Sequence, residues 1–89
     1  MATWNETKRR RNLAKHRVDL AIADRFDFIS AIIEEDDSEA YGEQRQVAIG
    51  RIDDAIYVYV YTLRGDEDHA ISLRRASPRE RRRYAEKKS

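Results

Sequence analysis

The sequence predicts a single α+β domain over residues 1–89, with two N-terminal helices, a four-stranded antiparallel sheet and a C-terminal helix. Helix-start signals occur near both ends of the chain. Between them lie short runs rich in β-branched and aromatic residues, which are typical of strands. Turn-forming residues separate these runs, so successive strands are expected to pair as an antiparallel meander around one modest core.

The first quarter of the chain carries two helix signals. Thr3 and Glu6 form a capping-box pattern, which predicts a helix over about residues 5–16. This helix has only a narrow apolar stripe and would need the rest of the domain to hold it. Asp19 can cap a second short helix, whose apolar residues recur every three positions and are expected to face inward.

Four segments have the composition of strands. We expect them at residues 28–33, 44–52, 56–62 and 69–75. The acidic residues 34–37 are expected to end the first strand, and residues 38–42 to form a loop. Tight turns are expected at 53–54 and 64–66. The third strand alternates tyrosine with β-branched residues, and its tyrosine face is more typical of a packing surface than of a ladder for stacking bases.

The C-terminal segment predicts a basic helix. Ser77 suits the N-cap, Pro78 the first helical position and Glu80 the third position of a capping box. Four arginines follow within the first turns, at Arg79, Arg81, Arg82 and Arg83. Guanidinium groups at this density favour a phosphate-rich partner, although a solvated helix surface would also explain the charge.

Charge is segregated along the chain, although the net charge is only +1. Residues 1–17 carry six Lys or Arg against one acid, and residues 71–89 carry eight against two. Residues 18–54 carry three Lys or Arg against eleven acids. If both basic ends meet in the fold, they form an electropositive face that attracts a polyanion. The acidic residues of 18–54 would then form the opposite face or bind a basic partner. The alternative is that the charges cluster on the surface by chance.

Composition also excludes some classes of protein. The chain has no cysteine, so it has no disulfide framework, in agreement with a cytoplasmic location. It has neither an apolar run of spanning length nor a secretory signal pattern, and we therefore expect no membrane partner.

A set of residues distributed along nearly the whole chain recurs in a known family. The segments are Trp4-Asn5 with Lys8, Asn12, Lys15-His16 and Val18; Tyr41 to Arg45 with Ile49-Gly50; Tyr61 to Asp66; and Ile71 to Ala76 leading to Glu80 and Tyr84. In their order and spacing they resemble the BrnT toxins, the ribonuclease halves of type II toxin–antitoxin pairs. Two positions depart from the family pattern, because His69 stands where Arg is usual and Arg17 where Gly is usual.

The resemblance implies a RelE-like fold and an RNA-cleaving activity that arrests translation. It implies a partner as well: a BrnA antitoxin with a ribbon-helix-helix DNA-binding domain. The toxin–antitoxin assembly would repress its own operon, so that the toxin reaches operator DNA only through the antitoxin.

RNA cleavage needs no cofactor when the ribose 2′-hydroxyl attacks its own phosphodiester. The protein must align the phosphodiester, remove a proton, stabilise the phosphorane's negative charge and protonate the leaving oxygen. The two histidines are far apart in the sequence and the carboxylates lack ligand spacing, so we expect no metal site and no cofactor.

Four residues are candidates for catalysis. Arg74 shares a strand face with Ser72 and is expected to bind phosphate and stabilise the transition state, unless it pairs with an acid such as Glu43. Arg64 could support the same phosphate from the neighbouring strand, or pair within its turn with Asp66.

The other two candidates are proton carriers. His16 could act as general acid or base, or interact with the C-terminus of its helix. Glu80 could accept a proton beside the arginines, although a capping box explains it without chemistry. His69 is a further candidate if it points into the cleft rather than toward the acidic turn beside it.

A second group is expected to bind RNA rather than to catalyse. It comprises Lys8, Lys15, Arg75, Arg79 and Tyr84. The cations would contact phosphates, which set affinity and salt dependence. The tyrosine would stack on an unpaired base, or else hold its helix to the sheet. The alternative function is a non-catalytic nucleic-acid or protein binding module that uses the same basic face.

Overall fold

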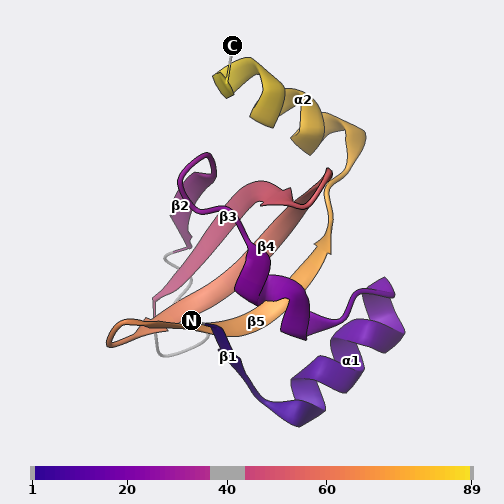
Figure 1. Cartoon of the computed structure of the whole chain (residues 1–89), viewed down its shortest axis with the longest axis vertical. Helices are drawn as coiled ribbons and strands as arrows, with labels where there is room; N and C mark the ends of the chain where they lie inside the picture. The colour runs from indigo at the N-terminus through magenta and orange to yellow at the C-terminus, as the bar shows by residue number, and fades with distance from the viewer. Residues whose placement is uncertain (1, 37–43, 89) are drawn as a thin grey trace.

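The computed structural model describes residues 2–36 and 44–88 (Figure 1). In chain order the elements are β1 (Ala2–Trp4), α1 (Glu6–His16), the 3₁₀ helix η1 (Leu20–Arg25), β2 (Ile32–Asp36), β3 (Arg45–Ile52), β4 (Ala55–Arg64), β5 (Glu67–Arg75) and α2 (Pro78–Lys88). The loop expected at 38–42 lies outside the described residues.

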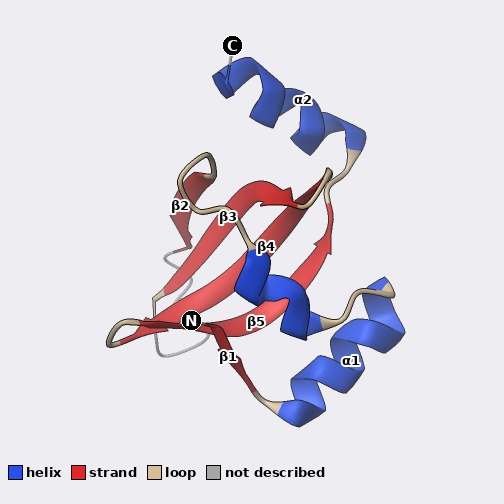
Figure 2. Cartoon of the chain, viewed as in Figure 1, coloured by secondary structure: helices blue, strands red, loops and turns tan. Residues whose placement is uncertain are grey.

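The described strands form one five-stranded mixed sheet in the order β1-β5-β4-β3-β2 (Figure 2). The predicted sheet of four antiparallel strands is therefore wrong. The extra strand is β1, which pairs in parallel with β5 through Trp4 and Ala70. Its backbone is tied down at Ala2, whose N–H donates to Asp24 Oδ1 at 2.7 Å. A three-residue strand that pairs about 66 residues along the chain has no local sequence signal.

The start of α1 also differs from the prediction. Its N-cap is Asn5, whose Oδ1 accepts hydrogen bonds from the N–H groups of Thr7 at 2.8 Å and Lys8 at 3.3 Å. Thr3 instead lies in β1, where its hydroxyl is 2.9 Å from His69 Nδ1. Asp19 does cap the second helix, as expected, but this helix is a 3₁₀ helix over Leu20–Arg25 rather than an α-helix.

The strand predicted at 28–33 begins later, at Ile32, and includes the acidic residues 34–36. The Asp27 side chain delays it, because this carboxylate accepts hydrogen bonds from Ile29 N at 3.1 Å and from Ser30 Oγ at 2.7 Å and so forms a turn. Acidic side chains are tolerated in β2 because it is an edge strand with cationic neighbours. Arg45 pairs with Asp36 at 2.7 Å, for example.

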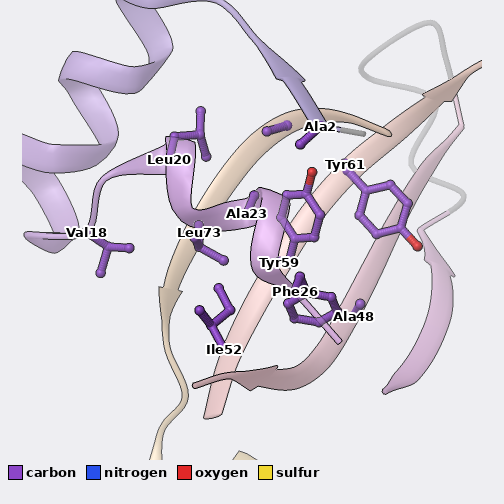
Figure 3. Close-up of a cluster of buried hydrophobic side chains, with 11 residues drawn as sticks. Ala2, Val18, Leu20, Ala23, Phe26, Ala48, Ile52, Tyr59, Tyr61 and Leu73 are labelled. Carbon is purple, nitrogen blue, oxygen red and sulfur yellow. The ribbon is translucent and has the colours of Figure 1, made fainter. Parts of the chain in front are cut away.

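The two sheet faces carry separate apolar clusters. On the face covered by η1, here called the η1 face, Leu20 and Phe26 pack on Tyr59 and Leu73 (Figure 3). Tyr59 is fully buried and donates to Asp68 Oδ2 at 2.6 Å; burial first, and then this hydrogen bond, raise the pKa of Tyr59. The tyrosine face of β4 is therefore part of the core.

The opposite face, here called the α2 face, is covered by α2 near one end of the sheet. Tyr84 and Ala76 pack there against Ile32, Ile49 and Val58. Among the described residues, no helix is long and apolar enough to span a membrane.

Candidate nucleic-acid and catalytic site

The site forms where β5 loses its neighbouring strand. The last β1–β5 pair joins Trp4 to Ala70, and beyond it α1 lies beside β5. At the same place β5 carries a bulge, because Ala70 pairs with Tyr61 and Ser72 with Val60, leaving Ile71 as the extra residue. The sheet edge is therefore irregular where the helix meets it.

Asn12 of α1 bonds directly to this edge. Its amide nitrogen donates to Leu73 O at 2.7 Å and to Val18 O at 2.9 Å, and its Oδ1 accepts from Leu73 N at 2.9 Å. The side chain is buried, with Asn12 only 5% exposed. Both backbone groups of Leu73 are thus satisfied in the absence of a neighbouring strand.

A pocket of about 230 Å³ opens between α1 and the bulge. Its lining residues are Lys8, Arg11, Asn12, Lys15, His16, Ile71 and Ser72. Besides Asn12, α1 contributes three cations and one histidine to this lining, and β5 contributes the apolar side chain of Ile71. Such a pocket can bind a phosphate through its cations and contact apolar surface through Ile71.

The structure thus brings together three predicted residues, Lys8, Lys15 and His16. Arg11 and Asn12 also line the pocket but were not assigned a role from the sequence. The signal for Arg11 was available, since it is four residues before Lys15 and therefore on the same side of the helix.

Not every cation of α1 belongs to the pocket. Arg9 points elsewhere and pairs with Asp19 and Glu6, each at 2.8 Å. These contacts lower the pKa of Asp19 to about 2, mainly through the hydrogen bonds from Arg9 and from the Ala21 N–H. The basic run at 8–11 is therefore divided between a structural ion pair and the pocket.

His16 is the residue of the pocket whose ordinary pKa lies near neutral pH. Burial lowers its pKa below the ordinary value, and the positive charges of Lys15 and Arg74 lower it further. The imidazole is therefore neutral at pH 7 and can accept a proton. A favourable interaction of imidazolium with the helix C-terminus would raise the pKa instead, so that effect does not dominate here.

Arg74 lies beside this pocket on the α2 face and pairs with Glu80. Its Nη1 donates to Glu80 Oε1 at 2.7 Å, and its Nη2 to Oε2 at 2.8 Å. Glu43, the acid named from the sequence, lies outside the described residues. The ion pair occupies the end of the guanidinium, and within residues 2–36 and 44–88 no acceptor is bonded to its Nε–H. The side of the guanidinium formed by Nε and Nη2 can then face a phosphate.

Glu80 does not suit proton transfer. The hydrogen bonds from Arg74 are the largest cause that lowers its pKa to about 2, and those from Ser77 add to it against the effect of burial. A carboxylate this acidic stays ionised at neutral pH and is a weak base, which argues against the expected role of Glu80 as a proton acceptor. The predicted capping box is confirmed, because Ser77 N donates to Glu80 at 2.8 Å and Glu80 N donates to Ser77 Oγ at 3.2 Å.

Arg64 is not part of this site. In the β4–β5 register Arg64 is opposite Glu67, next to the turn of the hairpin, whereas Arg74 is opposite Val58. Six residues along β4 separate the two positions, a distance of roughly 20 Å. The expectation that Arg64 supports the phosphate held by Arg74 is therefore wrong.

Two residues expected to bind RNA have other positions. Arg75 points to the η1 face, where its guanidinium is 5.4 Å from the centre of the Tyr57 ring. Tyr84 is buried at 7% exposure, and its hydroxyl is 3.0 Å from Ser30 Oγ. It holds α2 to the sheet and cannot stack on a base, so that expectation is wrong.

Arg79 and His69 are the last two sequence-derived candidates. Arg79 is exposed in the first turn of α2, next to Glu80. His69 contacts Thr3 across the β1–β5 pair, away from the pocket. Among the described residues, no group of three His, Asp or Glu side chains could hold a metal ion.

The chain matches a known protein family. Residues 4–80 match the family model described as "Ribonuclease toxin, BrnT, of type II toxin-antitoxin system". The matched region contains α1, the whole sheet from Trp4 onward and the capping box of α2. No curated protein matches the chain.

Proposed function

The chain belongs to the BrnT family of ribonuclease toxins of type II toxin–antitoxin systems, and we propose that its catalytic centre is the pocket between α1 and the bulge of β5. The reaction is a metal-independent endonucleolytic cleavage in which the ribose 2′-hydroxyl attacks the adjacent phosphorus. The observation that carries this proposal is the placement of one neutral imidazole among several cations. Cleavage of this kind would inhibit translation.

His16 is the general base of the proposed reaction. A neutral imidazole can take the 2′-hydroxyl proton as this oxygen bonds to phosphorus. The bond from phosphorus to the 5′-oxygen then breaks, and the leaving 5′-oxygen takes up a proton from water. Its lowered pKa keeps it neutral at pH 7, which supports this role. The cations around it also favour the negative charge that develops on the phosphorane.

Arg74 binds the scissile phosphate through the side edge of its guanidinium. Glu80 has a positioning role, because the two hydrogen bonds that it accepts from Arg74, at 2.7 and 2.8 Å, fix the plane of the guanidinium. Lys8, Arg11 and Lys15 bind neighbouring phosphates or share this one. We keep Arg79 as a flanking RNA contact, since it is exposed one residue before Glu80.

Membership of a type II family means that a protein antitoxin is the natural partner. We propose that it is BrnA-like, with a ribbon-helix-helix DNA-binding domain, and that operator DNA is bound through this partner. An electropositive pocket favours acidic or extended antitoxin segments. Binding there would neutralise the toxin by excluding RNA.

The test is incubation of the purified chain with a long messenger RNA in excess EDTA, followed by mapping of the cut ends. The wild type is expected to leave 2′,3′-cyclic phosphate or 3′-phosphate ends. Arg74→Ala should cut about 10²- to 10³-fold more slowly, because a preorganised donor is lost. Arg51→Ala is the matched control, since Arg51 is an exposed arginine of the same sheet that lies outside the pocket.

Two results would count against the proposal. Cleavage that requires a divalent metal contradicts the metal-independent reaction. Absence of cleavage by the wild type, on free RNA and on translating ribosomes, while RNA binding is kept, favours the non-catalytic binding module.

A further inference from the structure

The Asn12 side chain takes the place of a missing strand. β1 stops pairing at Ala70, and three residues further on Asn12 bonds both the N–H and the C=O of Leu73. An edge strand left without such partners exposes its backbone groups. The third hydrogen bond, to Val18 O, ties the same amide to the segment that leaves α1. One buried side chain thus joins the helix, the following turn and the sheet.

This junction lies between the two halves of the proposed site. On the helix, Lys8 is one turn before Asn12 and His16 one turn after it, so all three share one side of α1. On the strand, Leu73 stands between Ser72 and Arg74. The distance from the imidazole to the guanidinium therefore depends on how α1 is held at Leu73.

We propose that Asn12 is a positioning residue of the ribonuclease site, whose three hydrogen bonds hold His16 and Arg74 in the relative geometry that cleavage needs. The expected effect of Asn12 on RNA cleavage rests on the proposed function. The expected effect of Asn12 on the surroundings of His16 can be measured without RNA.

The amide is the only common side chain that fits these bonds at this length. Asn12→Asp keeps the acceptor for Leu73 N–H, but it faces the carbonyl groups of Leu73 and Val18 with a carboxylate in place of a donor. Asn12→Ala removes all three bonds and leaves buried backbone groups of Leu73 unsatisfied. The two variants therefore loosen the contact to different degrees.

The first readout is an NMR pH titration of the two histidines in the absence of RNA. The groups that face His16 are Lys15, Lys8 and Arg11 on its own helix and Arg74 on β5. In Asn12→Ala we expect the pKa of His16 to rise toward about 6.5, since both burial and the approach of Arg74 are reduced. His69, which contacts Thr3, should titrate as in the wild type, as should both histidines in the exposed control Thr7→Ala.

The second readout is kcat and KM for RNA cleavage at pH 8, where His16 is neutral in every variant. Asn12→Ala and Asn12→Asp should each lower kcat by about 100-fold while KM changes only a few-fold, as expected for misplaced catalytic groups. Asn12→Asp, which keeps the side-chain length and the acceptor for Leu73 N–H, is the second variant in case Asn12→Ala does not fold. Thr7→Ala should keep both parameters.

The inference is overturned if kcat at pH 8 is unchanged in a folded Asn12 variant. It is also overturned if His16 and His69 shift together, since Asn12 would then act on the whole fold. A shift confined to His16 in a chain that cleaves no RNA would contradict the proposed function but support Asn12 as the residue that sets the surroundings of His16.

Discussion

At the scale of single residues, the site depends on how each charge is balanced. Glu80 neutralises Arg74 and fixes its orientation, so this arginine presents an ordered edge rather than a mobile charge. His16 has no carboxylate among the groups that shift its pKa, and its neighbours are cationic. The two residues therefore have opposite electrostatic environments, which suits one to bind anions and the other to accept protons.

The first prediction concerns the pH range of activity. His16 accepts a proton only when it is neutral, and its folded-state pKa lies below 6.5. The cleavage rate should therefore be highest near pH 8 and decline as pH falls, with a midpoint below pH 6.5. In Arg74→Gln one of the causes of the shift is removed, so the pKa of His16 should rise in an NMR titration. An unchanged or lower value in that variant, with Arg51→Gln as control, would contradict the placement of Arg74 near His16.

The second prediction concerns Glu80 and stability. Its pKa is lowered in the folded state to about 2, so its contribution is fully present above pH 4.5 and is lost as pH falls toward 2. Glu80→Gln should lower the free energy of unfolding by about 1–2 kcal/mol at pH 7, through loss of the ion pair and weakening of the cap. Urea unfolding should show this difference shrinking between pH 4 and pH 2.5. A difference that is the same at both pH values would exclude the ion pair as its source.

At the scale of elements, α1 carries a strained end. Its C-cap is Arg17, which has φ 58° and ψ 30° in the left-handed region and donates its N–H to Leu13 O at 2.9 Å. Glycine is favoured at such a position because it has no Cβ. Arg17 is thus a residue type that the geometry of this turn disfavours.

The third prediction follows from this turn. Arg17→Gly should raise the free energy of unfolding by about 0.5–1 kcal/mol, since the strain is relieved while the N–H bond to Leu13 is kept. Arg17→Ala should give no such gain, because alanine keeps the Cβ. Thermal unfolding of the three proteins measures the difference, and equal stabilisation by both substitutions would show that the arginine side chain, not the backbone, is responsible.

Elements with a local signal could be predicted from the sequence, and those set by distant partners could not. The capping box of α2 is confirmed because Ser77 and Glu80 interact with each other. The strands β3, β4 and β5 were expected at nearly their observed bounds, since their side chains alternate. β1 was missed because only its pairing with β5 makes it a strand.

The candidate site was predictable to a similar extent. Lys8, Lys15 and His16 stand out as cations and a titratable group on one helix, and the structure places them in one pocket. The position of Arg64 depended on the hairpin register, and the burial of Tyr84 on packing against Ser30, neither of which sequence spacing specifies. Asn12 has no charge or nucleophile to mark it, and only its contacts with Leu73 show what it does.

At the scale of the whole molecule, β5 connects the two basic ends of the chain without bringing the two helices together. α1 lies beside this strand, α2 follows its C-terminal end, and the acidic segment β2 is at the opposite edge of the sheet (Figure 1). The segregation of charge in the sequence becomes only a partial separation in space, because α2 packs against β2 and β3 and its Arg83 pairs with Glu34 of β2. The cations of α1 lie beside β5, away from β2, and a polyanion is attracted to them there.

The fourth prediction tests this polarity through salt dependence. Arg11 lines the pocket, whereas its neighbour Arg10 is exposed and does not. Arg11→Ala should weaken binding to single-stranded RNA and reduce the slope of log affinity against log salt by about 0.7, the value for one lost phosphate contact. Arg10→Ala should leave the slope nearly unchanged. Equal slopes in the two variants would mean that RNA follows another path across the surface.

The most direct test of the catalytic pocket is the cleavage rate of His16→Asn in EDTA, measured beside its affinity for RNA. This substitution keeps a polar side chain of similar reach but removes the titratable base. We expect the rate to fall by about 10²- to 10⁴-fold while RNA affinity stays within a few-fold of the wild type. A variant that binds RNA and cleaves it at the wild-type rate would contradict the assignment of the catalytic centre to this pocket.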